Sequence, residues 1–410
     1  MNILTNKKME LLCPAGTLQG LKTAVDFGAD AVYIAGNEFG MRTAAAMNDD
    51  ALKEGIDYAH SKGGRVHITC NTIPHNDEIK RMPAFLEKLN SFGADAIIAS
   101  DLGSMRLIQK YAPKAELHVS VQSGTVNSET AKAFYEMGAK RIVLARELTL
   151  DEVAQIRYET PKELEFELFA HGAMCVSFSA RCLLSDYMTG RDANRGACAQ
   201  ACRWHYSLVE EKRPGQYYDI SEADGGTYIL NANDLKMAEH LDRFKEIGID
   251  SIKIEGRAKS EYYIAVVTNA YRGALDSLYN AQGDWKCPEW VTAELEKISH
   301  RPYSTGFYFG RPNGEQTYES AGYLRDYSVA ATVEGYEDGC IIAILKNKFL
   351  RGCTLDCLEP GSEPFLVSTD ELFDGDNNPI EAAPSPMMKI KIPCSRPVKS
   401  GAVLRMKCVE

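Results

Sequence analysis

One phrase recurs four times along the chain and constrains the fold more than any other feature. Its copies begin at Phe27, Phe92, Met137 and Ile247. In each copy a glycine follows an amphipathic helical stretch and precedes a short apolar run, as in Phe-Gly-Ala-Asp-Ala-Val-Tyr-Ile-Ala. Glycine suits the left-handed residue that closes a helix, and a β-branched run suits a buried parallel strand. The phrase therefore predicts a repeated helix–turn–strand joint rather than a binding motif.

The repeats organise the first two thirds of the chain into alternating strands and helices. Helical segments over 50–62, 77–92 and 260–278 are examples of the connections between the strands. Eight strands alternating with eight helices over about 280 residues predict a TIM-like (β/α)8 barrel. A doubly wound open sheet is the alternative, but no Gly-x-Gly-x-x-Gly turn follows the first strand. The predicted strands are Glu10–Leu12, Ala31–Ala35, Arg65–Cys70, Ala96–Ser100, Leu117–Val121, Arg141–Ala145, Leu164–Ala170 and Ser251–Ile254.

The alternation breaks twice, and the breaks predict the domain organisation. Residues 172–226 form a long insertion after the seventh strand of the barrel domain, 1–299. Residues 300–326 are then a connector. Residues 327–410 carry short alternating runs divided by Gly, Pro and Asp, which predict a small all-β barrel or sandwich domain. The strands expected there are Ser328–Glu334, Cys340–Leu345, Met388–Ile392 and Ala402–Met406.

Length and charge exclude some classes of protein. The 410 residues are enough for two or three domains, and 45% of them are hydrophobic, so the chain can bury a sizeable core. With 46 Lys and Arg against 57 Asp and Glu, the net charge of −11 gives no general argument for a nucleic-acid partner, which would need a local basic surface. The N-terminus has no signal-peptide pattern, and apolar runs stay far below the ~20 residues of a membrane helix. We expect a soluble cytoplasmic protein without membrane association.

Four of the twelve cysteines fall within 28 residues, in the pattern Cys175-x6-Cys182-x15-Cys198-x3-Cys202. Converging thiolates in a reducing compartment hold zinc or an iron–sulfur cluster. Zinc ribbons favour two Cys-x-x-Cys knuckles, and this spacing is more typical of a cluster. The alternatives are a structural zinc ion and four unligated buried thiols. Basic residues that could offset the negative charge of a cluster lie among the cysteines: Arg181, Arg191, Arg195 and Arg203.

Polar residues follow most of the predicted strands. In a (β/α)8 barrel these positions surround the active site, so they predict a site for a small polar molecule. Arg146 and Arg257 could clamp carboxylates, and His171 or Glu255 could transfer protons. The alternative for each residue is that it caps a helix or pairs with a neighbour. The residues concerned are Asn71, Asp101, Gln122, Arg146, His171, Glu255 and Arg257.

A weaker signal comes from the connector and the C-terminal strands. Aromatic residues from Tyr303 to Tyr318 are interleaved with arginines, and residues 387–407 carry six Lys or Arg and no acidic residue. Aromatic faces stack on bases and basic strands follow phosphates, so this region could hold single-stranded RNA. The alternative, which we favour on this pattern alone, is packing between domains and a solvated strand face.

The segment from Glu167 to Ser185 resembles the signature of the family filed as U32 peptidases, the collagenase-like proteases. Cys175 and Cys182 match that signature, and the one departure is Ala180, where the family has glycine. The opening Glu-Leu-Leu-Cys-Pro-Ala-Gly at 10–16, the stretch from Lys253 to Arg257 with the following Tyr262, and the segment 231–235 also look like the family. The resemblance covers nearly the whole chain.

Within the family, one barrel plus one short β-domain is similar to the branch that forms 5-hydroxyuridine in tRNA. The resemblance implies prephenate-dependent, oxygen-independent hydroxylation of the wobble uridine. Its implied partners are tRNA, prephenate and the iron–sulfur assembly machinery. Cysteines placed like Cys175, Cys182, Cys198 and Cys202 would hold a [4Fe-4S] cluster, and the resemblance adds Asp234 and Tyr262 to the candidate site as a catalytic and a substrate-binding residue.

Two other functions remain open from the sequence. A peptidase of the collagenase-like kind could use a Cys175–His171 dyad, although the chain has neither a His-Glu-x-x-His zinc site nor a Gly-x-Ser-x-Gly elbow. A cysteine that ligates a cluster is not a free nucleophile, which makes proteolysis the weaker hypothesis. A zinc-stapled RNA-binding protein without catalysis is the third.

Overall fold

The structure is a computed structural model that describes residues 7–41, 46–175, 177–204, 208–209, 217–218, 233–310 and 326–408. The chain divides into two compact units. The first comprises Met1–Val25, Ala29–Lys259 and His300–Tyr323, and the second comprises Asp26–Gly28, Ser260–Ser299 and Leu324–Glu410. The predicted boundary after residue 299 assigns helices α10 (Glu261–Asn280) and α11 (Glu289–Leu295) to the barrel domain, whereas in the structure they group with the C-terminal strands.

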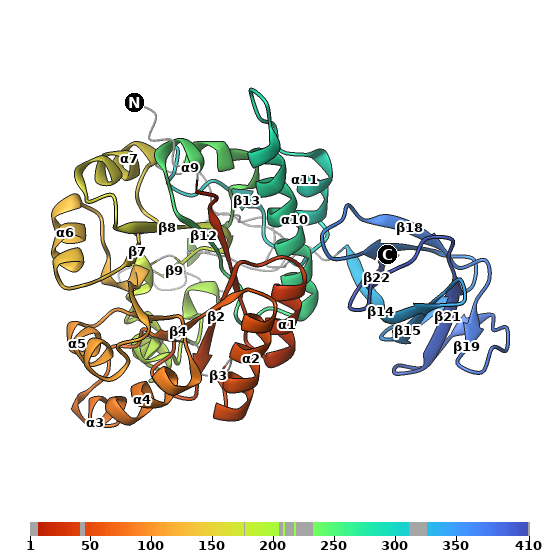
Figure 1. The fold of residues 1–410 in the computed structure, drawn as a ribbon, viewed down its shortest axis with the longest axis horizontal. Coiled ribbons are helices and arrows are strands. Elements are labelled where there is room, and N and C mark those ends of the chain that lie inside the picture. The colour runs from red at the N-terminus through yellow and green to blue at the C-terminus, as the bar shows by residue number, and fades with distance from the viewer. Residues whose placement is uncertain are drawn as a thin grey trace. The chain divides into compact units, whose positions relative to one another are not determined.

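The first unit contains a closed barrel of eight parallel strands, as the sequence predicts (Figure 1). Each strand pairs with its neighbour in parallel, and pairing of β12 with β8 closes the ring. The barrel strands are β1 (Glu10–Pro14), β2 (Ala31–Gly36), β4 (Arg65–Cys70), β5 (Ala96–Ala99), β6 (Glu116–Val119), β7 (Arg141–Val143), β8 (Glu165–Ala173) and β12 (Ser251–Ile254).

Helices connect the strands and surround the barrel in Figure 1. The expected helix over 77–92 is split into α3 and α4, because Pro83 lies in the first turn of α4 and suits a helix start. The helices of this unit are α1 (Leu18–Asp26), α2 (Asp49–Ser61), α3 (Asn76–Ile79), α4 (Met82–Phe92), α5 (Leu102–Tyr111), α6 (Ser128–Glu136), α7 (Leu150–Glu159), α8 (Leu184–Thr189) and α9 (Leu241–Ile247).

The repeated phrase is a helix-closing turn in all four copies. Gly28, Gly93, Gly138 and Gly248 have φ between 82° and 101°, the left-handed region that favours glycine. In each copy the N–H group of the next residue donates to the carbonyl five residues earlier, at 2.9–3.2 Å. This is the bond that closes a Schellman motif. The prediction of a structural joint is confirmed.

The aspartate of the phrase has a further role that the sequence pattern did not reveal. Asp95 Oδ2 accepts a hydrogen bond from the backbone N–H of Val66, the second residue of β4, at 2.8 Å. Asp30 and Asp250 accept equivalent bonds from the second residues of β1 and β8, at 2.8 and 3.0 Å. In the three copies that carry the aspartate, the phrase therefore joins the helix end to the neighbouring strand; the third copy has Lys140 at this position.

We expect Asp95→Ala to lower the free energy of unfolding by roughly 1–3 kcal/mol, because the buried N–H of Val66 would lose its acceptor. Urea-induced unfolding followed by circular dichroism measures this change. Asp95→Asn, which keeps a side-chain oxygen, should recover much of it. Asp77→Ala is the control, since that carboxylate is 98% exposed. Equal stability of Asp95→Ala and wild type would contradict this role.

Beyond the barrel, β8 continues into a short sheet at its carboxyl end. β11 (Asp234–Lys236) pairs antiparallel with the last residues of β8, and β13 (Tyr303–Ser304) pairs in parallel with β11. Between β8 and β11 lies the predicted insertion, in which α8 and the short strands β9 (Leu208–Val209) and β10 (Tyr217–Tyr218) are described. This insertion carries the four clustered cysteines.

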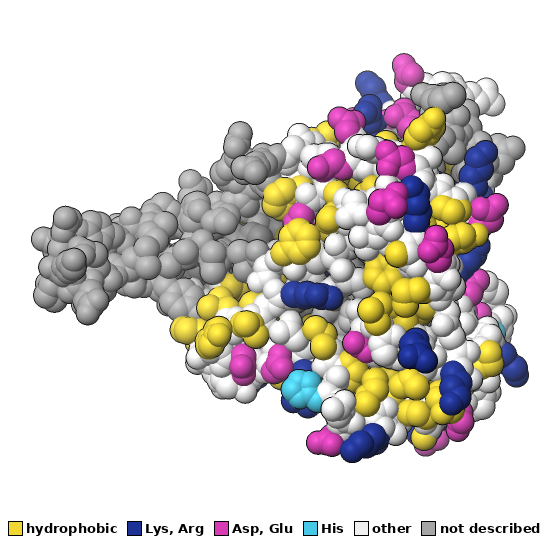
Figure 2. All heavy atoms as spheres, turned by 90° about the vertical axis from the view of Figure 1, so that its left-hand side faces the viewer, with side chains coloured by type: hydrophobic (Ala, Val, Ile, Leu, Met, Phe, Trp, Pro, Cys, Tyr) yellow, Lys and Arg dark blue, Asp and Glu magenta, His cyan; other side chains and the backbone are white. Residues whose placement is uncertain are grey.

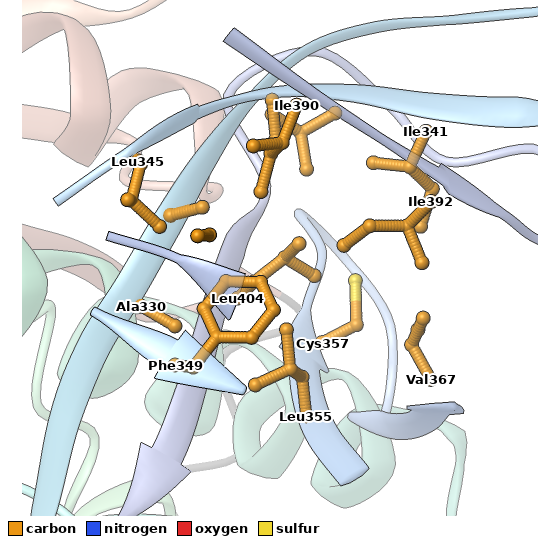
Figure 3. Packing of buried hydrophobic residues seen from close by; sticks show 14 of the residues in the cluster. Ala330, Ile341, Leu345, Phe349, Leu355, Cys357, Val367, Ile390, Ile392 and Leu404 are labelled. Carbon is orange, nitrogen blue, oxygen red and sulfur yellow. The ribbon is translucent and has the colours of Figure 1, made fainter. Parts of the chain in front are cut away.

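The second unit carries an antiparallel sheet of seven strands in the order β18-β17-β22-β14-β15-β21-β19. The predicted all-β character of the C-terminal domain is confirmed. Ile341, Leu355, Ile390 and Leu404 are fully buried in its apolar core (Figure 3). Its strands are β14 (Tyr327–Glu337), β15 (Cys340–Leu345), β16 (Phe349–Leu350), β17 (Thr354–Leu358), β18 (Phe365–Ser368), β19 (Phe373–Asp374), β20 (Ala382–Ala383), β21 (Lys389–Pro393) and β22 (Val403–Lys407).

Basic residues of the C-terminal strands have acidic partners in the same unit. Arg405 is buried and binds Glu294 and Asp356, with N–O distances of 2.6 and 3.0 Å. Lys389 lies 3.3 Å from Glu334, and Arg396 lies 3.0 Å from Glu359. These pairs favour the solvated-face and packing interpretation over an open basic stripe for RNA. Among the described residues, no helix is long and apolar enough to cross a bilayer.

Candidate functional site

A pocket lies at the carboxyl ends of the barrel strands, where the fold places active sites. Strands β2, β4, β7, β8 and β12 contribute one side of its wall, and the insertion contributes the other. Five residues predicted for the strand ends line it: Asn71, Gln122, Arg146, Glu255 and Arg257. All four clustered cysteines line the same pocket.

The pocket wall is more basic than acidic. Among the described residues, Arg146, Lys253 and Arg257 line it, and Glu255 contributes a carboxylate. Arg146 donates to the Ala173 carbonyl at 3.0 Å, with its guanidinium 3.7 Å from the centre of the Phe169 ring. Because the ring covers a face of the Arg146 guanidinium, the N–H groups at its edge can still donate to a carboxylate.

The second arginine is held at the pocket by a hydroxyl group. Arg257 Nη1 donates to Thr69 Oγ1 at 2.9 Å, and the arginine is only 5% exposed. Glu255 accepts a longer contact from the Tyr33 hydroxyl at 3.4 Å. Gly172 allows β8 to pass beside Glu255, because a Cβ there would lie 2.4 Å from the Glu255 carbonyl oxygen. The pocket therefore offers fixed cations and one carboxylate to an anionic, polar ligand.

Two amide side chains complete this wall. Gln122 is 2% exposed, and neither atom of its amide group has a hydrogen-bond partner within the part of the chain that the structure describes. Asn71 accepts from the backbone N–H of Met41 at 3.1 Å. A buried amide without partners is costly, so Gln122 fits a position that a bound ligand or water satisfies.

The four thiols lie on the insertion side of the pocket. The backbone N–H of Leu184 points at Cys182 Sγ (3.3 Å), and that of Gln200 points at Cys198 Sγ (3.4 Å). Hydrogen bonds of this kind stabilise thiolate sulfur and tune the clusters that thiolates hold. In the described residues, no three Cys, His, Asp or Glu side chains are gathered as a site for a single metal ion. The donor set, four thiols around one pocket with backbone N–H groups facing two of them, fits a thiolate-bound cluster.

Other predicted residues lie outside this pocket. His171 is inside β8 rather than beyond it, because the strand runs three residues further than predicted, to Ala173. Its ring lies 5.4 Å from that of Tyr303. Burial lowers the pKa of His171 well below its usual value, and the nearby His300, Lys236 and Lys259 lower it further. His171 is therefore a buried neutral histidine at pH 7.

Three more predicted residues have structural partners. Asp234 forms a buried ion pair with Arg301 at 2.6 Å. Tyr262 belongs to the second unit, where its hydroxyl donates to the Lys297 carbonyl at 3.0 Å. Asp101 caps α5 by accepting from the N–H of Ser104 at 2.8 Å. None of the three lines the pocket.

Lys253, Thr69 and Tyr33 also line the pocket, although no strand-end pattern predicts them. They point inward from within strands, not from beyond the strand ends. A signal was present, since polar residues alternate with apolar ones along several predicted strands, as in Ser-Ile-Lys-Ile at 251–254 and Glu-Phe-Glu at 165–167. Successive side chains of a strand point to opposite faces, so every second residue of a barrel strand faces the interior. Polar residues at every second position therefore indicate a polar barrel interior.

Beneath the pocket, charged side chains fill the barrel. Lys253 Nζ lies 2.8 Å from Glu167, which lies 3.3 Å from Arg141. Arg141 also binds Glu10 and Glu165, at 2.5 and 2.8 Å. Burial alone would raise the pKa of Glu10, but Arg141 outweighs it and holds that pKa well below its usual range. The network connects the pocket floor to the amino-terminal end of the barrel.

Two histidines lie in the same interior. His67 and His118 are fully buried with ring centres 4.9 Å apart, and neither nitrogen of His67 has a hydrogen-bond partner among the described residues. Burial lowers the pKa of both histidines, and Arg141 adds to this. In the unfolded chain they titrate near the usual value of about 6.5.

We therefore expect stability to fall between pH 7 and pH 5.5, since below pH 6.5 the unfolded state binds protons that the folded histidines do not. Each histidine contributes up to ~1.4 kcal/mol per pH unit in this range. His67→Leu should reduce the fall by about 1 kcal/mol at pH 5.5. Urea unfolding at several pH values measures it. His60→Leu is the control, because that ring is 40% exposed. An identical pH profile in His67→Leu and wild type would contradict the assignment.

The chain belongs to peptidase family U32. The model of that family matches residues 16–318, and the model of the family's C-terminal domain matches residues 325–405. The chain is 33% identical over 403 residues to tRNA hydroxylation protein P1 of Bacillus subtilis, covering 97% of this chain and 95% of that protein. It is 34% identical over 448 residues to tRNA hydroxylation protein P of Escherichia coli, covering 98% and 97%. A third relative is the 23S rRNA 5-hydroxycytidine C2501 synthase of Escherichia coli, 35% identical over 387 residues, which covers 90% of this chain and 57% of that protein.

Proposed function

We propose that this protein hydroxylates RNA, and specifically that it converts the wobble uridine of tRNA to 5-hydroxyuridine. The observation that carries the proposal is the length of the match: relatives named for tRNA hydroxylation align over almost the whole of both chains. A relative named for rRNA hydroxycytidine synthesis shares the same core. The barrel pocket with four thiols on one wall is consistent with an oxidative reaction on a small group.

The reaction replaces C5–H of the base with C5–OH. With water as the source of the oxygen atom it releases two electrons and two protons, so the co-substrate must act as the two-electron acceptor. We propose that Cys175, Cys182, Cys198 and Cys202 hold a [4Fe-4S] cluster, because these thiols line one pocket. Such a cluster supplies one-electron transfer when bound. We also propose prephenate as the co-substrate and no role for dioxygen. Arg146 and Arg257 would bind its two carboxylates, since a guanidinium fork matches a carboxylate.

The remaining pocket residues are proposed to orient the bound substrates and to transfer protons. Glu255 is the carboxylate on the wall and is the candidate for moving a proton, with the Tyr33 hydroxyl beside it. Gln122 and Asn71 offer amide groups to the uracil or to the co-substrate. His171, Asp234 and Tyr262 support the surrounding structure in this proposal, because their partners lie outside the pocket.

The test is nucleoside analysis of tRNA from cells in which the gene is deleted. We expect 5-hydroxyuridine and its derivatives to disappear and to return with the wild-type gene. Arg257→Lys, which keeps the charge but loses the fork, should restore much less modification at equal protein level. Unchanged 5-hydroxyuridine in the deletion strain would refute the proposal.

Proteolysis, which the family name suggests, receives less support from the geometry. A Cys175–His171 dyad needs both side chains in one site, and the pocket is lined by Cys175 but not by His171. Iron-free protein with peptidase activity that Cys175→Ser abolishes would reinstate this alternative.

A further inference from the structure

The described part of the insertion exposes large hydrophobic side chains beside the pocket. Of the twelve such side chains exposed in the described residues, five fall between residues 177 and 204. Three are aromatic and are called here the mouth rings: Phe178, Tyr187 and Trp204, which are 53%, 82% and 40% exposed. Leu183 and Met188 are the other two.

The mouth rings are continuous with the pocket wall. Phe178 follows Ser177, which lines the pocket, and lies over Gly124, where an added Cβ would be 3.3 Å from its ring. Trp204 follows Cys202, another lining residue, by two positions. α8, which carries Tyr187, begins at Leu184, also in the wall. The rings therefore belong to the segment of the chain that forms one side of the pocket.

The charge of this segment differs from that of the whole chain. Residues 177–204 contain four arginines and two aspartates, a net charge of +2, whereas the chain carries −11. Arg181 and Arg191 are exposed within it. By contrast, acidic and basic side chains are intermingled over the face of α5–α7 that Figure 2 shows. Aromatic rings with interspersed arginines are what single-stranded nucleic acid recognises.

The geometry of the pocket adds a reason for exposed rings. A base inside a folded RNA enters a pocket only when it leaves its stack, and its neighbours then lose their stacking partners. Flat side chains at the pocket mouth replace those partners. A protein partner would also favour tyrosine and tryptophan, but it would not by itself call for a local excess of arginine.

We propose that the mouth rings form a stacking platform for the bases that flank the target nucleotide in a single-stranded RNA loop. The proposal rests on the proposed function in one respect, that RNA is the substrate. In this proposal the flanking bases stack on Tyr187 and Trp204, the two mouth rings that are furthest in sequence from the barrel strand β8. Arg181 and Arg191 bind the phosphates.

The test is binding of a fluorescently labelled anticodon stem-loop RNA to anaerobically purified full-length protein, followed by fluorescence anisotropy. Tyr187→Ala and Trp204→Ala should each weaken binding roughly 5- to 100-fold, the usual loss for one stacked base. Tyr187→Phe keeps the flat ring and should bind like wild type. Tyr158→Ala is the matched control, because Tyr158 is 69% exposed on α7, outside the insertion, and its loss should leave binding unchanged.

Salt dependence separates the two kinds of contact. The Tyr187→Ala variant should keep the wild-type slope of log affinity against log salt, since stacking releases no counterions. Arg191→Ala should reduce that slope by about 0.7 for one lost contact to single-stranded RNA. Iron content and circular dichroism equal to wild type confirm that each variant is folded and loaded.

The experiments distinguish failure of the stacking platform from failure of the proposed function. If the alanine variants bind RNA like wild type while the wild-type gene still supplies 5-hydroxyuridine, the platform is refuted and the proposed function stands. If they bind RNA normally but lose self-association or a protein partner, the mouth is a protein-docking surface and the platform is refuted. If wild type binds no RNA and deletion leaves tRNA unchanged, the proposed function fails first.

Discussion

Replacing any one of Cys175, Cys182, Cys198 and Cys202 with serine is expected to abolish the proposed iron–sulfur cluster and RNA hydroxylation together. The four thiols line one pocket, and backbone N–H groups face two of the sulfurs. A cubane cluster needs every one of its protein ligands for stable retention, and serine is a poor substitute for a thiolate. The measurement is iron and sulfide content after anaerobic purification. We expect about four of each in wild type and fewer than one in each variant.

Cys408→Ser provides the control for this prediction. Cys408 is an exposed cysteine, but it lies after the last C-terminal strand and outside the pocket. Its replacement should leave iron, sulfide and hydroxylation at wild-type levels. Wild-type protein that carries one zinc ion and no sulfide would contradict the prediction and would make the insertion a structural zinc site. Retention of four irons in Cys198→Ser would show that another residue supplies the ligand.

The barrel could be predicted because its signals are local. A glycine that closes a helix and an apolar run that forms a buried strand lie next to each other in sequence, so Gly93 and the strand after it mark a joint without tertiary information. Among the C-terminal strands that were not predicted, β16 and β20 contain two residues each and pair with each other across 30 residues or more. Their strand character comes from the partner and not from their own pattern.

The candidate site could be predicted only in part, for a related reason. Asn71, Gln122, Arg146, Glu255 and Arg257 follow strand ends, and the ends of parallel strands meet at one face of the barrel. His171 failed to follow this rule, because pairing with β11 extends β8 past the predicted end. Lys253 was missed because it points inward from the middle of a strand, where an ion pair with Glu167, 86 residues away in sequence, stabilises its charge.

The interior network leads to the second large effect: Arg141→Ala is expected to lower the free energy of unfolding by roughly 3–5 kcal/mol. Arg141 is 1% exposed, and its guanidinium contacts Glu10, Glu165 and Glu167. Removing it leaves buried carboxylates with too few cations, which costs more than the pair itself contributes. Urea unfolding at pH 7 measures the change. Arg106→Ala, on the exposed face of α5, should stay within about 0.5 kcal/mol of wild type.

The pH dependence of this loss identifies its cause. In wild type, burial would raise the pKa of Glu10 and Glu165, but the basic groups around them together outweigh burial and lower both pKa values; Arg141 acts on both carboxylates, and Lys7 also acts on Glu165. Their contribution to stability is therefore present above pH 4.5 and lost as the pH falls through the lowered values. Without Arg141, burial loses the strongest charge that opposes it, so both pKa values rise and protonation relieves the variant as the pH falls from 7 towards 5. The difference between wild type and Arg141→Ala should shrink over that interval. A difference that stays constant from pH 7 to pH 5 would assign the loss to packing of the arginine side chain, because removal of its aliphatic carbons costs the same at every pH.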